Sequence, residues 1–257
     1  MNGFLLIDKP TGWTSFDVVA KVRGGLEKQI TADPNLCACD ACNQELRRRS
    51  EDSTSPKRPH RVKVGHSGTL DPFATGLLIL AVGKATKQIE QLMGLPKTYE
   101  ATVKLGSTTD TLDTESEEQF VNDHEPSLDE VKQALSTFVG EIEQIPPKFS
   151  ALKVNGRRAY DLARKGEEIK LKARKVTVHE LELIDYTYPL IKIRTIVSKG
   201  TYIRTLAQDI GDQLGSGGYC SELRRRQIGP YLVGNASNVD NTDILNRLHT
   251  PETSDTV

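Results

Sequence analysis

Hydrophobic positions in the first hundred residues alternate between short continuous runs and helical spacing. The apolar runs at residues 4–7 and 77–82 predict two buried strands. Thr14 and Asp17 have the spacing of a capping box and predict the start of a helix, and residues 84–93 predict a second, short helix. The positions expected to face inward in these two helices are Phe16, Val19, Val22, Leu26, Ala85, Ile89, Leu92 and Met93.

The second half of the chain mixes strand and helix patterns without a regular strand–helix–strand repeat. Alternating apolar residues predict strands at 99–105, 176–184 and 191–197, with Tyr99 on the apolar face of the first. Helices are predicted from Ser127, where Glu130 completes a capping box, and from near Gly200. Their inward positions are Leu128, Val131, Leu135, Phe138, Val139, Ile203, Leu206, Ile210 and Leu214, with Arg204 off the centre of the second stripe. This mixture predicts an α+β fold with a mixed, largely antiparallel sheet flanked by helices.

Charge is balanced overall but segregated along the chain. The sequence has 34 Lys and Arg against 35 Asp and Glu, so net charge alone indicates no polyanionic partner. Residues 110–130 contain nine acidic groups and no Lys or Arg, which is typical of a solvated face that repels RNA. Residues 148–175 contain ten basic groups with Phe149 and Tyr160 among them. This region fits a surface that follows phosphates, or an exposed basic hairpin and helix without a partner.

Residues 31–60 form a polar stretch that predicts a long exposed insertion. It contains Cys37, Cys39 and Cys42, which could bind Zn²⁺ with His60 or Cys220 as a fourth ligand. A single Cys-x-x-Cys motif is also compatible with reduced thiols on an exposed loop. Apolar stretches are too short for a membrane span, and the first residues lack a basic secretory region, so a cytoplasmic protein is expected.

The segment Gly65–Pro72 is the strongest candidate for chemistry. It places an imidazole, His66, five residues before a carboxylate, Asp71, in a glycine-containing loop that precedes a buried strand. Pro72 keeps the backbone of Asp71 out of the helical region. An Asp that only closes a turn before proline would give the same pattern, and the remaining motifs decide between the two interpretations.

Five blocks of sequence together resemble the TruB family of tRNA pseudouridine synthases, over about residues 2 to 235. They are Asn2–Pro10; Gly65–Asp71 with Ala74-Thr75-Gly76 and Ala85-Thr86-Lys87; Tyr99 with Leu105–Thr111; Ser150–Lys153 with Arg158-Ala159-Tyr160; and Ser198–Arg204 with Leu223-Arg224-Arg225. Each block alone is weak, whereas their order along one chain is specific. The resemblance implies a pseudouridine synthase-like fold.

The resemblance also implies an activity: isomerisation of the uridine at position 55 in the T loop of tRNA to pseudouridine, without a cofactor. Asp71 matches the catalytic aspartate, which attacks either the sugar or the base. Arg204 matches the guanidinium that holds this carboxylate ionised and aimed. Tyr99 matches the aromatic residue that stacks on the flipped base, although its strand position alone would favour a core tyrosine.

Further matches concern substrate binding. His66 matches a histidine that contacts the T loop, and Tyr202 and Leu223 match substrate-pocket positions. Lys9 and Lys87 match basic residues near the site, where ordinary surface charge is the alternative. The basic region, about residues 146–175, corresponds to the segment that grips the T-arm of tRNA. The protein is expected to act as a monomer.

The expected organisation is a catalytic domain at 1–236 and a polar tail at 237–257, anchored by Leu245 and Leu248. Bacterial relatives usually continue into a small PUA domain, and the tail is shorter than the roughly 50 residues of a small domain, so weaker tRNA affinity is expected. The basic half of the 31–60 insertion suggests additional RNA contact. Two other functions fit less well: an RNA-binding protein without catalysis, which has no use for Asp71, and an RNA-guided box H/ACA synthase.

Overall fold

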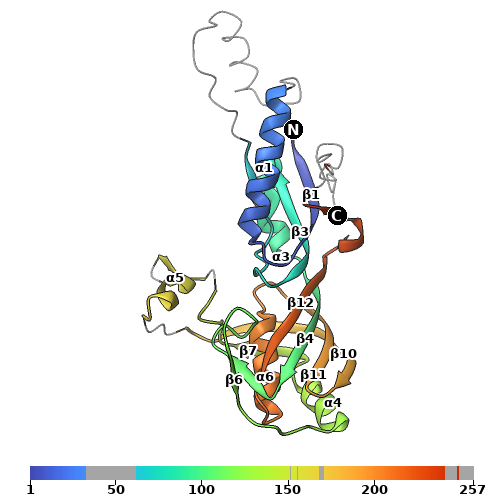
Figure 1. The fold of residues 1–257 in the computed structure, drawn as a ribbon. Coiled ribbons are helices and arrows are strands. Elements are labelled where there is room, and N and C mark those ends of the chain that lie inside the picture. Colours follow the sequence, from blue (N-terminus) through green and yellow to red (C-terminus); the bar gives the residue numbers. More distant parts are fainter. Residues whose placement is uncertain (33–61, 151, 155, 168–170, 241–247, 249–257) are drawn as a thin grey trace, which may run out of the picture. The chain divides into compact units, whose positions relative to one another are not determined.

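The computed structural model describes residues 1–32, 62–150, 152–154, 156–167, 171–240 and 248, and it divides into two compact units. Unit 1 comprises Met1–Gly94 and Pro230–Val257, and unit 2 comprises Leu95–Gly229. Each unit combines helices with strands that pair mainly antiparallel, as the sequence predicted (Figure 1).

Unit 1 is a small sheet with one long helix against it. Its elements are β1 (Gly3–Lys9), α1 (Ser15–Ala32), β2 (Val64–His66), β3 (Thr75–Val82), η2 (Gly83–Gln88), α3 (Ile89–Gly94), η3 (Val233–Asn235) and β14 (Ser237–Asn238). Strand β3 pairs antiparallel with both β1 and β2, and β14 pairs parallel with β1. The core between α1 and the sheet contains Leu5, Ile7, Val18, Val19, Val22, Leu26, Ile30, Val62, Val64, Leu78, Leu80, Val82 and Val239.

Helix α1 starts as predicted, because Thr14 and Asp17 cap it reciprocally. The amide and hydroxyl of Thr14 donate to Asp17 Oδ2, and the Asp17 amide donates to Thr14 Oγ1. The inward position of Phe16 was predicted wrongly, since its side chain is 65% exposed. It lies about 90° around the helix from the centre of the buried stripe that runs from Val18 to Ile30.

The single helix predicted over 84–93 is two shorter elements, the 3₁₀ helix η2 and the α-helix α3. Ala85 and Leu92 are buried as predicted, but Met93 is 45% exposed. The change from three to 3.6 residues per turn moves later side chains away from the face that a continuous α-helix would bury.

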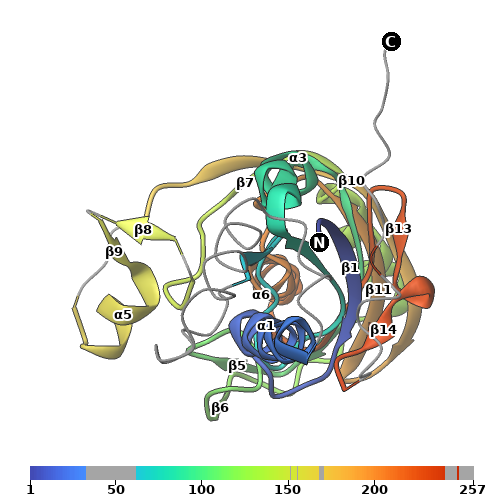
Figure 2. The same cartoon turned by 90° about the horizontal axis from the view of Figure 1, so that it is seen from above.

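Unit 2 has a five-stranded antiparallel sheet in the order β12-β4-β11-β10-β7, with two helices packed on it and small hairpins. Its elements are β4 (Lys97–Leu105), β5 (Ser107–Thr109), β6 (Glu118–Phe120), α4 (Leu128–Thr137), β7 (Gly140–Gln144), β8 (Lys153–Val154), β9 (Arg157–Arg158), α5 (Ala159–Arg164), β10 (Arg174–Thr187), β11 (Leu190–Val197), α6 (Ile203–Gln213) and β12 (Gly218–Ile228), whereas the short strand β13 (Tyr231–Leu232) belongs to unit 1. Figure 2 shows the β8–β9 hairpin and α5 projecting from these strands.

The long strand β12 was not predicted from the sequence. Its second half contains Arg224, Arg225 and Arg226 in succession, a pattern that resembles a solvated loop. Arg225 is nevertheless only 1% exposed, because it lies opposite Tyr99 on the buried face of the sheet. The sequence pattern of a single strand could not reveal this burial, since it depends on the neighbouring strand.

Helices α4 and α6 begin where the sequence predicted. Ser127 and Glu130 form the capping box of α4, although Leu128 and Val139 at its ends are 46% and 48% exposed rather than buried. Helix α6 buries its predicted stripe and packs against β12 and β4. It approaches β12 so closely that a Cβ atom on Gly211 would lie 2.4 Å from the carbonyl carbon of Gly217.

A carboxylate pair on α6 makes the stability of the protein depend on pH. Burial, and secondarily the charge of Asp212, raise the pKa of Asp209 to about 6. Because the pKa of Asp209 is higher in the folded state than in the unfolded state, this residue's contribution to stability is fully present below about pH 4. The contribution is lost as the pH rises through about 6. We expect Asp209→Asn to increase the free energy of unfolding at pH 7.5 by about 1 to 2 kcal/mol, allowing for solvent screening of the partly exposed group.

Urea titrations of Asp209→Asn at pH 4 and pH 7.5 measure this effect. The gain should be smaller at pH 4, where Asp209 is largely protonated in the folded protein. An equal gain at both pH values would show that the carboxylate charge is not the cause. The exposed Asp123→Asn provides the control, and it should change neither value.

Residues after position 236 contribute more to the core of unit 1 than was expected of a polar tail. Val239 is only 2% exposed in the core, and Leu248 packs partly buried against the same cluster. Leu245 and the 31–60 insertion lie outside the described residues, apart from the start of the insertion in α1. No helix in the part of the chain that the structure describes is long and apolar enough to cross a membrane.

Candidate active site

The loop that carries Asp71 is fixed by backbone hydrogen bonds at both ends. At its start the Ser67 amide donates to the carbonyl of Ile79 on β3 at 3.0 Å, and at its end the Gly12 amide donates to the carbonyl of Pro72 at 2.8 Å. Between them, Asp71 is partly exposed and its carbonyl accepts from the Ala74 amide. The carboxylate is therefore carried on a braced turn that solvent can reach.

Two buried side chains join this loop to the start of α1. Ser15, 2% exposed, accepts a hydrogen bond from the Leu70 amide at 2.8 Å and donates to the Leu70 carbonyl at 3.0 Å. Lys9 is fully buried, and its Nζ donates to the carbonyls of Pro10, Trp13 and Pro72 at 2.9, 2.6 and 3.2 Å. Lys9 is thus not ordinary surface charge, because it connects the segment that follows β1 to the backbone directly after Asp71.

The other predicted residues of unit 1 lie at different places. His66 ends β2, is partly exposed, and its Nδ1 accepts from the Gly68 amide at 3.4 Å. Lys87 is exposed on η2. His66 therefore lies directly before the braced loop that carries Asp71, whereas Lys87 belongs to a separate helical turn.

In unit 2, Tyr99 and Leu223 lie on one face of the sheet. Tyr99 on β4 pairs with Thr195 on β11 and with Arg225 on β12, and Leu223 on β12 pairs with Ala101. Residues two apart on a strand share a face, so the Tyr99 ring and the Leu223 side chain are diagonal neighbours. Both are largely buried, at 9% and 8% exposure.

Arg204 lies in the first turn of α6 and is held by residues of distant segments. Its Nη1 donates to Asp113 Oδ2 at 2.9 Å and to the Thr111 carbonyl at 2.8 Å, and its Nη2 donates to the Phe149 carbonyl at 2.9 Å. The guanidinium and the Asp113 carboxylate are 4% and 1% exposed. This buried ion pair fixes the orientation of Arg204 within unit 2.

Asp113 was assigned wrongly to the solvated acidic face. It is fully buried, and its Oδ1 also accepts from Thr111 Oγ1 at 2.6 Å and from the Glu115 amide at 2.9 Å. The acidic run hid the residue among exposed neighbours. The signal that could have distinguished it is the surrounding Thr-rich loop, whose hydroxyls can satisfy a buried carboxylate.

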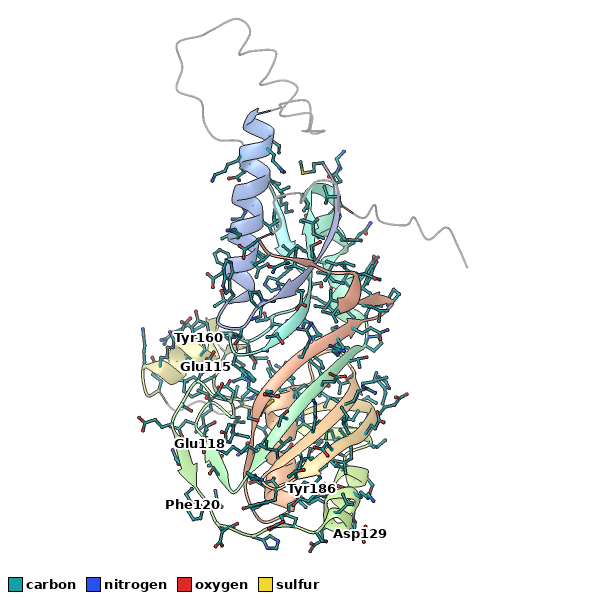
Figure 3. All side chains as sticks on the ribbon, turned by 45° about the vertical axis from the view of Figure 1, so that its right-hand side comes forward. Glu115, Glu118, Phe120, Asp129, Tyr160 and Tyr186 are labelled. Atoms are coloured by element: carbon teal, nitrogen blue, oxygen red, sulfur yellow. The ribbon has the colours of Figure 1, made fainter. Side chains whose placement is uncertain are left out.

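The basic region forms a small separate lobe of unit 2. Tyr160 and Arg164 of α5 make a cation–π contact at 5.7 Å, and Arg157 pairs with Glu167 at 2.9 Å. Tyr160 is seen on this lobe in Figure 3, where Phe120 of β6 points outward from another hairpin. Among the side chains of the region that the structure describes, the exposed basic ones are Lys148, Arg157, Arg164, Lys165, Lys172, Arg174 and Lys175.

A family model described as "TruB family pseudouridylate synthase (N terminal domain)" matches residues 57–203, and these include the Asp71 loop and Tyr99. The chain belongs to the TruB family. A second model, "tRNA pseudouridylate synthase B C-terminal domain", matches residues 204–256, from Arg204 into the segment predicted as a polar tail.

Relatives with this family name are similar over most of the chain. The tRNA pseudouridine synthase B of Parabacteroides distasonis is 46% identical over 226 residues, 88% of this chain and 85% of that protein. The same-named protein of Chlorobaculum tepidum is 44% identical over 240 residues, 92% of this chain and 88% of that protein.

Solved structures confirm the pseudouridine synthase fold of this TruB family member. The chain aligns with one in a Cbf5-Nop10-Gar1 complex at a TM-score of 0.63 and 28% identity, covering 95% of this chain and 54% of that one. It aligns with a chain of an H/ACA RNP bound to a substrate RNA containing 2′-deoxyuridine at a TM-score of 0.60 and 27% identity, covering 94% and 52%. This chain spans about half the length of either.

The predicted Zn²⁺ site and the predicted pairing of Asp71 with Arg204 both stay predictions for this TruB family chain. Cys37, Cys39 and Cys42 lie outside the described residues, while Cys220 is buried on β12 and donates to the Glu222 carbonyl. Among the residues described, no group of three or more His, Cys, Asp or Glu could hold a metal ion. Asp71 and Arg204 belong to different units, and their pairing stays a prediction.

We expect Asp113→Asn to lower the free energy of unfolding by about 3 kcal/mol, because it leaves the buried Arg204 charge without its counter-charge. Urea unfolding followed by circular dichroism measures the change. The control is Asp110→Asn, three residues earlier and exposed, which should cost less than about 0.5 kcal/mol. Equal losses in the two variants would contradict a net contribution from the buried pair.

Proposed function

We propose that this TruB family chain isomerises uridine 55 in the T loop of tRNA to pseudouridine, with Asp71 as the nucleophile. The observation that carries the proposal is the loop around Asp71, which is braced at both ends while the carboxylate stays partly exposed. Relatives 44–46% identical carry the name tRNA pseudouridine synthase B, which supports tRNA as the substrate.

The reaction exchanges one glycosidic bond for another. The C1′–N1 bond breaks, the base turns while it is held, and a C1′–C5 bond forms. The hydrogen on C5 leaves as a proton and N1 gains one, so atoms and electrons balance without a redox partner. The protein has to supply a nucleophile, a surface for the detached base and a base for the C5 proton.

The residues proposed for these tasks come from both units. Asp71 attacks the sugar or the base, and Arg204 keeps the carboxylate ionised and aimed. Tyr99 stacks on the flipped base and assists removal of the C5 proton, with Leu223 beside it on the same sheet face. Tyr202 lies directly before α6, two residues from Arg204, and we propose it as a residue of the substrate pocket.

The basic lobe is proposed to grip the T-arm. Its exposed Lys and Arg side chains precede, belong to and follow α5 along the chain, and Tyr160 of α5 is partly exposed. Phosphate contacts of this kind supply affinity that falls with increasing salt and carries little sequence preference. His66 and Lys87 are proposed as further contacts near the target uridine, and Lys9 as support for the Asp71 loop.

Tritium release from an unmodified T-arm hairpin labelled at uridine C5 tests this function. We expect release by the protein alone, without added guide RNA, and no release from a hairpin in which the target uridine is replaced by cytidine. Release only after a guide RNA is added would indicate an RNA-guided enzyme. Binding without release in either case would indicate a non-catalytic RNA-binding protein.

A further inference from the structure

The segment from Gln144 to Phe149 holds the first turn of α6. Both ends of this segment take part in hydrogen bonds with residues at the start of the helix, and each bond involves one side chain. At one end Gln144 bonds to the backbone of Tyr202, and Thr205 Oγ1 donates to the Ile145 carbonyl at 3.4 Å. At the other end the Phe149 carbonyl accepts from Arg204 Nη2 at 2.9 Å. One short stretch of chain therefore contacts three of the first residues of the helix.

Gln144 makes the most specific of these contacts. It ends β7 and is only 2% exposed. Its Nε2 donates to the Tyr202 carbonyl at 3.2 Å, and its Oε1 accepts from the Tyr202 amide at 3.0 Å. The side-chain amide thus pairs with both backbone groups of one residue, as a neighbouring strand would.

This pairing replaces the usual device for starting a helix. Tyr202 is the N-cap of α6, and its own side chain makes no capping hydrogen bond. The backbone that leads into α6 is instead fixed from outside by Gln144. Since a helix fixes the direction of every side chain in its first turn, the backbone angle at Tyr202 also sets the direction of Arg204 two residues later.

The segment itself has little freedom. Pro146 and Pro147 are buried, and proline restricts the backbone angle φ to near −65°. The two prolines therefore limit how far the backbone at Gln144 and the backbone at Phe149 can move relative to each other. In addition to its bonds to Asp113 and Thr111, Arg204 is held by this segment in two ways: through the helix start by Gln144, and directly by the Phe149 carbonyl.

We propose that Gln144 is a positioning residue for the isomerisation, which aligns Tyr202 and Arg204 through the backbone of the first turn of α6. The inference rests on the proposed function, because it assigns Arg204 and Tyr202 to that site. Gln144 precedes the basic lobe and is buried, so it contributes to the rate of the reaction on bound RNA and leaves RNA affinity unchanged.

The test compares Gln144→Met with Gln213→Met. Methionine keeps the length of the side chain but lacks both hydrogen-bonding groups. Gln213 ends the same helix, where its Oε1 accepts from Thr137 Oγ1 at 3.1 Å, so its variant removes a bond from the opposite end of α6. We expect Gln144→Met to lower the single-turnover rate on a saturating T-arm hairpin about 10- to 100-fold, with Kd within about 2-fold of the parent. Gln213→Met should keep both values.

A second variant separates positioning from loss of packing. A protonated carboxylic acid in Gln144→Glu can donate and accept in the same geometry as the amide, whereas the ionised form repels the Tyr202 carbonyl. The rate of Gln144→Glu relative to the parent should therefore rise as pH falls, while the ratio for Gln144→Met should stay constant. A merely structural defect would give the two variants the same pH dependence.

Hydrogen exchange at the Tyr202 amide gives a readout independent of activity. Exchange should be faster in Gln144→Met than in the parent, because the variant lacks the Gln144 Oε1 atom that accepts from the Tyr202 amide. Parental rate and exchange in Gln144→Met would overturn the inference, as would equal losses in Gln144→Met and Gln213→Met. If the parent protein releases no tritium, the proposed function fails. In that case the exchange measurement still tests Gln144, because unchanged exchange at Tyr202 in Gln144→Met would show that Gln144 does not hold the start of α6.

Discussion

Asp71→Asn is expected to abolish pseudouridine formation while leaving tRNA binding intact. An amide has the shape of the carboxylate but is not a nucleophile, so no covalent step can begin. The loop should remain in place, because the Lys9 and Ser15 hydrogen bonds that brace it use backbone groups and not the Asp71 side chain. We expect tritium release to fall on the order of 10⁴-fold or more.

Tritium release and filter binding with the same labelled T-arm hairpin measure the two effects for Asp71→Asn. Asp123→Asn, an exposed carboxylate of the acidic run, is the matched control and should keep the parental rate. Release by Asp71→Asn at a sizeable fraction of the parental rate would refute Asp71 as the nucleophile. Loss of binding together with release would indicate a damaged loop.

Arg204→Lys is expected to be the second most harmful change, with a rate reduced on the order of 10²-fold. The guanidinium donates from two different nitrogens to the Thr111 carbonyl, Asp113 and the Phe149 carbonyl, and a single ammonium group cannot reproduce that planar arrangement. The remaining charge should keep the protein folded, which circular dichroism would verify.

Arg194→Lys provides the control for Arg204→Lys. Arg194 on β11 also contacts two acidic residues, Glu100 and Glu182, but its side chain is 48% exposed. Exposed ion pairs tolerate this replacement, so the control should keep its rate. Near-parental turnover of Arg204→Lys in the tritium assay would argue against a geometric role for the guanidinium.

The elements that the sequence predicted are those with local signals. The caps at Thr14 and Ser127 and the stripe of α6 involve residues three or four positions apart, so a single sequence shows them. Strand β12 was missed because its arginines become buried only through pairing with β4. Phe16 and Met93 were misplaced because small changes in helix phase move a side chain out of the core.

Within the candidate site, the residues that were missed are likewise those that depend on partners far away along the chain. Asp71, Tyr99 and Arg204 were identified by resemblance to a family, and their chemical roles stay predictions. Asp113 and Gln144 were not among the residues matched to the family, and the residues that they hold, Arg204 and Tyr202, lie 91 and 58 residues away along the chain. Their polar side chains suggest exposure, and only the tertiary structure shows that each is buried with its hydrogen bonds satisfied.

The pairing of β14 with β1 bears on how the protein forms during translation. Unit 2 is one continuous stretch and can fold as soon as it has left the ribosome. Unit 1 needs β14 and Val239 to complete the sheet and core that begin with β1, so its N-terminal part must wait until residues 237–239 have been synthesised. The nascent chain would therefore complete the sheet of unit 2, with its basic lobe, before the sheet of unit 1 that carries the Asp71 loop has its last strand.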